Sequence, residues 1–138
     1  MRLCKRGLIA FAALVLLLVG ALLVNHVIEI VQIRDFYAGR KILSAMHQAK
    51  LEAIAAHRSS HGAAKDALLA ALRTGTPKSE VTSALSGEDV VCEDVRRQPG
   101  LICYVPPSKH PITVDNWHIE LRFDRDDKLA DARVLILK

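Results

Sequence analysis

Hydrophobic positions along the chain follow three successive patterns. An unbroken, uncharged stretch covers residues 7–24 and follows three basic residues. Residues 26–58 then carry apolar positions at helical spacing, and from about residue 88 apolar and polar side chains alternate. A helical period followed by a two-residue period is typical of an α+β chain. The order predicts an N-terminal membrane helix, a helical stalk and a small domain with a sheet.

The leading apolar stretch is long enough to cross a bilayer, since a span needs about 20 residues at about 1.5 Å each. Basic residues stay on the cytoplasmic side, so residues 1–6 are expected in the cytoplasm and residues 7–25 in the lipid. A cleaved signal peptide is the competing interpretation, with Val19-Gly20-Ala21 as the small-residue cleavage site. The stretch continues beyond that site, which favours a retained anchor with the bilayer as a partner.

Residues 26–60 are predicted to form a helical stalk, because they contain no proline and a single glycine. Four apolar residues recur at a 4-3-4 spacing and share one face: Ile42, Met46, Ala49 and Ala53. This stripe is thin and short for a coiled coil. A stalk that docks on its own domain is therefore favoured, and self-association through the stalk is the alternative. Residues 59–62, Ser-Ser-His-Gly, break the period and are the predicted joint with the domain.

The exported domain, residues 61–138, is expected to begin with two short helices. They cover residues 63–73 and 77–85. Thr76 can cap the second helix, and proline is favoured at its first position. Val81 and Leu85 are spaced i, i+4, so they would share its buried face.

Four strands are expected after these helices, and the first two carry Cys92 and Cys103. The turn-like sequence at 96–100 separates them, and a hairpin that pairs Val95 with Gly100 would place the cysteines opposite each other. An exported domain permits a disulfide. Closing a loop of about a dozen residues would contribute about 3 kcal/mol. A redox role needs a tighter motif such as Cys-x-x-Cys, which is absent, so a structural cross-link is predicted.

Residues 117–123 are the clearest predicted strand, because Trp, Ile, Leu and Phe alternate there with His, Glu and Arg. This alternation predicts one buried face, and it favours the core over an interface for Trp117. The acidic turn from Asp124 lacks the glycine and the distal glutamate of a calcium loop, so ordinary turn chemistry explains it. The fold class is thus α+β, with two helices on an antiparallel four-stranded sheet.

Two segments resemble the BamE-like domain, also called SmpA/OmlA: residues 72–87, LRTGTPKSEVTSALSG, and residues 117–129, WHIELRFDRDDKL. The positions that carry the resemblance are Gly75, Thr76, Val81, Leu85, Gly87, Trp117, Phe123 and Asp124. Gly87 comes one place late and Thr76 one place early for the family. The resemblance implies a two-layer sandwich and a non-enzymatic envelope protein that binds other proteins. Well-known members are lipoproteins, whereas the transmembrane helix here points to the bacterial inner membrane, with the domain in the periplasm.

Charge and candidate chemistry narrow the function classes. The net charge is +4, but three basic residues precede the membrane helix, and the 16 basic and 15 acidic residues after residue 25 nearly balance. Aromatic residues are scarce too, which argues against nucleic-acid binding. Only His57 and His61 have ligand-like spacing, and no third ligand lies near them, so no metal site is predicted. No catalytic motif is present, and we expect no catalytic residues and no cofactor.

Candidate partner-binding residues are those that the predicted fold leaves on the surface: Tyr104, Pro106, Pro107, Lys109 and His110, with Arg96 and Arg97 at the hairpin tip. They would present a sheet edge and a loop to an envelope protein. The alternative is that Tyr104 only covers the hairpin and that the two arginines serve solubility. The alternative function is a structural assembly subunit resembling type IV pilins, since a basic leader ending in Gly7, about fifty helical residues and a stapled sheet fit that plan. The glutamate that the family carries five residues after its cleavage point is absent, and Ala12 stands there.

Overall fold

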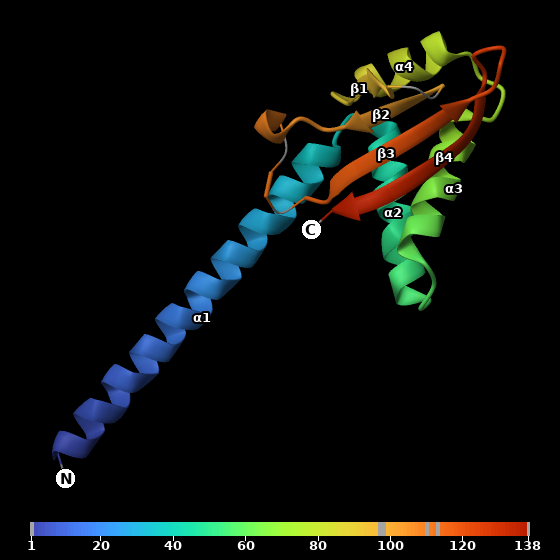
Figure 1. Cartoon of the computed structure of the whole chain (residues 1–138). Helices are drawn as coiled ribbons and strands as arrows, with labels where there is room; N and C mark the ends of the chain where they lie inside the picture. Colours follow the sequence, from blue (N-terminus) through green and yellow to red (C-terminus); the bar gives the residue numbers. More distant parts are fainter. Residues whose placement is uncertain (1, 97–98, 110, 113, 138) are drawn as a thin grey trace.

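A computed structural model of the chain describes residues 2–96, 99–109, 111–112 and 114–137, with side chains from residue 10 onward. In this part of the chain the fold is α+β, with four α-helices and one antiparallel sheet (Figure 1). The helices are α1 (Arg2–Tyr37), α2 (Lys41–Ala55), α3 (Ser60–Leu72) and α4 (Lys78–Ser86). The strands are adjacent in chain order: β1 (Val91–Asp94), β2 (Gly100–Tyr104), β3 (Asn116–Phe123) and β4 (Leu129–Leu137). A short 3-10 helix, η1 (Pro107–Lys109), lies between β2 and β3.

α1 is one continuous helix of 36 residues that projects away from the domain (Figure 1). An 18-residue window between Ala10 and Tyr37 has a mean hydropathy of 2.5, and none of that window is buried in the structure. Its apolar side chains are exposed all around the helix, for example Phe11, Leu16 and Leu22. By length and composition, α1 is therefore a candidate membrane helix.

The region predicted as one stalk, residues 26–60, is divided. α1 ends at Tyr37, and Gly39 adopts φ +81°, a conformation that glycine reaches without strain and that lets the chain turn back. α2 then packs along α3, and Leu43 and Met46 lie fully buried in the domain core. The predicted apolar stripe thus docks within the chain, and α2 is part of the domain core instead of a continuation of α1.

The helix ends differ from the predictions in two places. The side-chain oxygen of Ser59 accepts a hydrogen bond from the Gly62 amide, so the predicted joint is the cap and first turn of α3. Thr76 was expected to cap α4, and this was wrong. Its hydroxyl donates to the Leu72 carbonyl at 2.5 Å, because the last carbonyls of α3 have no partner within their own helix. α4 begins after Pro77 without a side-chain cap.

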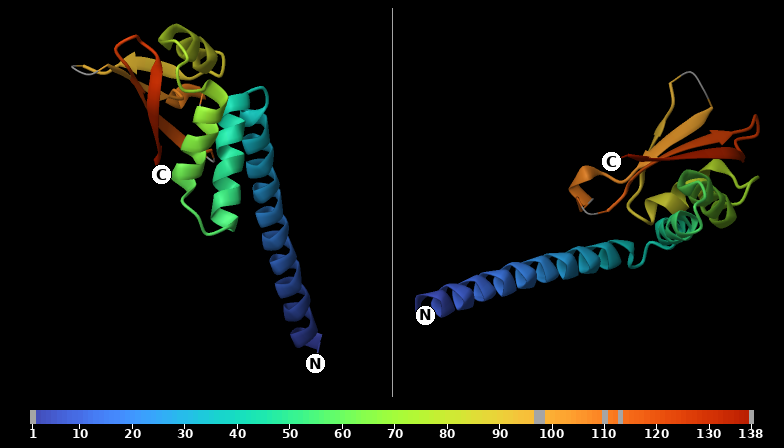
Figure 2. Two further views of the ribbon diagram at one scale, coloured as in Figure 1. Left: turned by 90° about the vertical axis from the view of Figure 1, so that its right-hand side faces the viewer. Right: turned by 90° about the horizontal axis from the view of Figure 1, so that it is seen from below.

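One face of the sheet packs on the helices, and Figure 2 shows the helices gathered on that side. Trp117, Ile119 and Leu121 on β3 are buried, as the alternation predicts. They share one core with Val81 and Leu85 of α4, which are both fully buried. The prediction that Trp117 belongs to the core is therefore confirmed, as is the α+β class.

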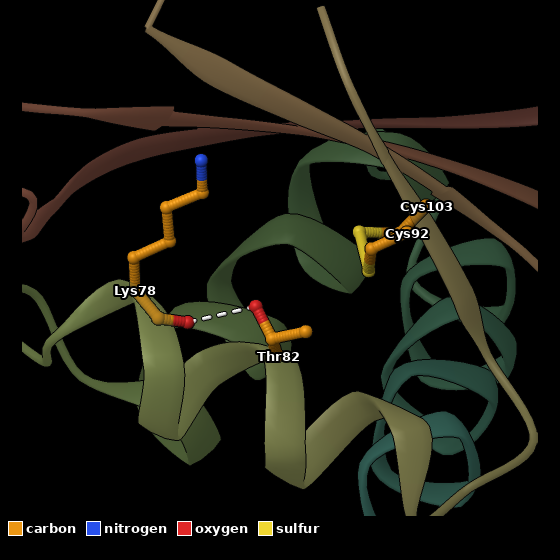
Figure 3. Close-up of a disulfide and its surroundings, with 4 residues drawn as sticks. All are labelled: Lys78, Thr82, Cys92 and Cys103. Atoms are coloured by element: carbon orange, nitrogen blue, oxygen red, sulfur yellow. Dashed lines mark hydrogen bonds between the residues drawn. A yellow bond between two sulfur atoms is a disulfide. The ribbon is translucent and has the colours of Figure 1, made fainter.

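The β1–β2 hairpin has the predicted register. The Val95 amide donates to the Gly100 carbonyl at 3.1 Å, and Cys92 pairs directly with Cys103. The two cysteines form a disulfide on the helix-facing side of the hairpin, near α4 (Figure 3). A Cβ at Gly100 would come within 2.7 Å of the Leu121 carbonyl oxygen. Glycine is needed at this position because β2 and β3 approach so closely.

The turn between β3 and β4 forms by local hydrogen bonds. The Asp124 carboxylate accepts from the amides of Asp126 and Lys128, both at 2.9 Å, which confirms the predicted turn chemistry. The Gly75 amide donates to the Leu129 carbonyl at 2.7 Å and so links the α3–α4 connection to the start of β4. These residues of the family-like segments therefore serve the fold.

Candidate functional site

The residues predicted to bind a partner are divided between the two ends of β2. Arg96 lies in the turn before the strand and is exposed. The connection after the strand holds three others: Pro106, Pro107 and Lys109. Two lie outside the described residues: Arg97 and His110. A strand of five residues spans roughly 17 Å, so these groups form two separate surfaces, and Tyr104 lies on the strand beside the second.

Lys109 is held within the fold. Its ammonium group pairs with the carboxylate of Asp89, which also binds the guanidinium of Arg40 at 2.7 Å. Hydrogen bonds from Lys109 and then Arg40 hold the pKa of Asp89 below its usual range. Lys109 therefore contributes to a structural contact, although more than half of its side chain is exposed.

Arg40 connects the end of α1 to the connection between α4 and β1. Its Nε donates to the Glu88 carbonyl at 3.1 Å, and the guanidinium also donates to the carbonyl of Phe36. The same guanidinium lies 4.4 Å from the centre of the Phe36 ring, in cation–π contact. We refer to four charged residues as the junction cluster: Arg40, Glu88, Asp89 and Lys109.

Glu88 caps α2 from a distant part of the chain. The residue is 6% exposed, and its carboxylate accepts hydrogen bonds from the amides of Ile42 at 2.5 Å and Leu43 at 2.8 Å. α2 has no acidic residue in its first turn and no side-chain cap of its own. Glu88 therefore supplies the acceptor and the negative charge that stabilise a helix N-terminus. Sequence reasoning missed this contact, for which the uncapped start of α2 is the only signal.

Aromatic and charged groups extend the junction to β3. The Trp117 Nε1 donates to the hydroxyl of Tyr37 at 3.1 Å, and the Tyr37 ring stacks on His47. His47 contacts Asp115 at 3.3 Å, and Lys50 pairs with the same carboxylate. The hydrogen bond with His47, followed by that from Lys50, lowers the pKa of Asp115 despite its partial burial. The end of α1, the middle of α2 and the start of β3 are thus joined.

Among the described residues, no helix covers the outer face of the sheet (Figures 1 and 2). One row of side chains crosses all four strands on this face, because its members are successive register partners: Val91, Tyr104, His118 and Leu135. We call these residues the outer row. Val91 is 41% exposed, and the other three are half-buried. The Tyr104 hydroxyl donates to the Glu93 carboxylate at 2.7 Å, and this bond raises the pKa of Tyr104.

Charged residues of both signs border the outer row. Glu120 contacts Arg133 at 3.8 Å, and Arg122 contacts Asp131 at 3.9 Å. Exposed pairs of this kind contribute little to stability. An apolar and aromatic row with a charge-balanced border is, however, the usual composition of a protein-binding surface.

The described part of the chain offers little for small-molecule chemistry. It contains no group of three or more His, Cys, Asp or Glu side chains that could hold a metal ion. His57 follows the end of α2 at φ +53°, whereas His61 lies in the first turn of α3, so they do not share a helix face. A hollow of about 780 Å³ beside α4 is open and is lined by polar groups such as Lys78 and Asp126. Thr82 in that hollow already donates to the Lys78 carbonyl at 2.8 Å (Figure 3).

The chain matches no family model, no curated protein and no solved structure. The resemblance to the BamE-like domain therefore remains a prediction from two short segments. Its positions are explained by packing and turns, as with Leu85 in the core and Asp124 in the β3–β4 turn. The outer row, by contrast, is not accounted for by packing in the core or by turns.

Proposed function

We propose that this protein is a non-enzymatic envelope protein, anchored in the bacterial inner membrane, whose periplasmic BamE-like domain binds another protein. α1 provides the anchor and the outer row provides the binding surface. The observation that carries the proposal is a bare sheet face, opposite the helical layer, with an apolar and aromatic row across all four strands. Sheet strands hold such a row rigidly, which reduces the entropy lost on binding.

The periplasmic location rests on charge and sulfur chemistry. Three basic residues precede the apolar stretch of α1, and basic residues favour the cytoplasmic side. The domain would then lie across the membrane, where an oxidising compartment permits the bond between Cys92 and Cys103. Both arguments lead to the same side of the membrane.

The partner is expected to offer an apolar patch at the centre of the contact. Tyr104 is suited to such a contact, because its ring is apolar and its hydroxyl is already oriented by Glu93. Arg133 and Glu120 would lie at the rim, where charges set specificity more than affinity. Among the residues named from the sequence, Tyr104 is thus the centre of the proposed interface.

The pilin-like alternative has less support. About fifty helical residues are present, but α1 ends at Tyr37 and the chain reverses at Gly39. These residues therefore form two separate helices and not one continuous helix. The apolar stripe of α2 is instead buried against its own domain.

Photo-crosslinking in native membranes tests the proposal. A photoreactive phenylalanine analogue at Tyr104 is expected to give one discrete adduct with another protein, whereas the analogue at exposed Ser79 on α4 gives none. Leu135→Lys in the Tyr104 reporter chain should abolish the adduct. Ser83→Lys adds the same charge on exposed α4 surface and should leave it unchanged.

Two outcomes would contradict this function. Equal adducts from Tyr104 and Ser79 would mean that the outer row has no special role. An adduct of twice the 15.2 kDa chain would identify a second copy and favour the assembly-subunit alternative.

A further inference from the structure

Exposed apolar side chains in the domain are concentrated on one side. Outside α1, the described residues include five large apolar side chains with substantial exposure: Leu51, Ile54, Val91, Ile112 and Leu137. Val91 belongs to the outer row. The other four come from three segments that are far apart in the sequence, namely the end of α2, the connection between β2 and β3, and the last residue of β4. We call these four residues the proximal patch.

These three segments lie on the side of the domain from which α1 arrives. In Figure 1 the connection after η1, the C terminus and the α2–α3 turn all lie toward the N-terminal end of α1, whereas α4 lies on the opposite side. Figure 2 agrees, since the α2–α3 turn in the left view and the η1 connection in the right view both point that way. The segments that carry the proximal patch therefore lie on the side of the domain toward the N-terminal part of α1.

The direction of α1 relative to the domain is fixed by packing. α1 runs unbroken into the core, where Phe36 and Tyr37 are buried. The junction cluster then ties its end to the α4–β1 connection. It also attaches η1 to the α4–β1 connection, because Lys109 pairs with Asp89. A membrane position for α1 therefore sets the position of the proximal patch as well.

The height of the domain above the bilayer follows from helix geometry. A span that begins near Gly7 uses about 20 residues and ends near residue 26. The remaining residues to Tyr37 rise about 16 Å, and the headgroup layer takes about 5–8 Å of that distance. The proximal segments reach back along α1 from Tyr37, so little room remains between them and the headgroups.

We infer that the proximal patch rests on the bilayer that α1 spans, with Ile112 as a shallow lipid contact. The inference depends on the membrane anchor of the proposed function. Ile112 is fully exposed, whereas Val105 and Val114, which lie before and after it in the chain, are buried. An apolar side chain at the height of the headgroups is stabilised when it enters the membrane interface, because its apolar surface is then removed from water. Arg58 in the α2–α3 turn adds a cation that suits anionic headgroups.

Tryptophan depth measurements on the full chain test this contact. The variant Ile112→Trp is reconstituted in nanodiscs of phosphatidylcholine and phosphatidylglycerol, with and without brominated acyl chains that quench nearby tryptophan. Ser79→Trp on α4 is the matched exposed control, and Phe11→Trp reports on α1. The signal of buried Trp117, the single native tryptophan, is subtracted by measuring the unsubstituted chain.

We expect brominated lipid to quench Ile112→Trp strongly, to quench Phe11→Trp more strongly, and to leave Ser79→Trp unchanged. If only Phe11→Trp is quenched, α1 is in the membrane but the patch is not on lipid, which overturns this inference alone. If Phe11→Trp is not quenched, α1 is not inserted, and both the inference and the anchor are overturned. If Ser79→Trp is quenched as much as Ile112→Trp, the contact lacks the predicted orientation and the inference is again overturned.

Discussion

The junction between α1 and the domain and the β1–β2 hairpin hold peripheral segments by different means. At the junction, Phe36 and Tyr37 are buried, and Glu88 places a carboxylate on the start of α2. β1 has no fully buried residue, and the Cys92–Cys103 disulfide attaches it to β2. A strand that buries little apolar surface gains little from packing. The comparison suggests that covalent linkage replaces packing where burial is small, and the following predictions test it from the larger expected effect to the smaller.

Removing the disulfide should have the largest effect. Cys92→Ser opens a loop of about a dozen residues and is expected to lower the free energy of unfolding by about 3 kcal/mol. The measurement is urea denaturation of the full chain in detergent micelles, followed by the fluorescence of buried Trp117. The reduced native protein should unfold like the variant. Equal midpoints for the oxidised and reduced native protein would show that the disulfide does not stabilise the hairpin.

Neutralising Glu88 should have an intermediate effect. Glu88→Gln keeps the size of the side chain but leaves one neutral acceptor for the two amides of α2 and turns an NH2 group, which cannot accept, toward the other, so we expect a loss of about 1–2 kcal/mol. The same denaturation assay applies. Asp66→Asn, at an exposed site on α3, removes the same charge and should change stability by less than about 0.5 kcal/mol. Equal effects of the two substitutions would mean that net charge, and not the cap on α2, is responsible.

Acid should weaken the junction and leave the contribution of the disulfide unchanged. The pKa values of Asp89 and Asp115 are lowered in the folded protein, so their stabilising effect is present above the usual aspartate pKa of about 3.9 and is lost as pH falls through the lower folded values. Asp115→Asn should therefore reduce the loss of stability between neutral pH and strongly acidic pH. The oxidised and reduced proteins should differ in free energy of unfolding by a similar amount at neutral and at strongly acidic pH, because disulfide-bonded cysteines do not titrate. An unchanged acid sensitivity in Asp115→Asn would remove that carboxylate from the explanation.

The contrast between the hairpin and the junction also explains which contacts could be predicted from the sequence. The register of Cys92 and Cys103 follows from a turn only a few residues long and a two-residue period, so local pattern is sufficient. Arg40 and Glu88 are 48 residues apart, and no local pattern indicates which carboxylate will meet which helix start. Tyr104 could be named as a surface residue, whereas the outer row depends on the pairing of four strands.

The stalk shows a second limit of local patterns. Residues 26–58 have helical propensity throughout, but propensity does not indicate whether the chain continues as one helix or turns back as a second one. Gly39 was visible as a single glycine, yet only tertiary packing makes it a reversal instead of a tolerated position within a helix. Thr76 shows the same limit. It lies between the end of α3 and the start of α4, and its hydroxyl donates to the Leu72 carbonyl of α3 instead of capping α4.

The unbroken entry of α1 into the core has a mechanical consequence. In the proposed membrane position, α1 would act as a rigid lever, so the tilt of its N-terminal half in the lipid would also set the orientation of the Tyr104 ring. Because bilayer thickness affects the tilt of a membrane helix, it would then influence which envelope proteins the ring can contact.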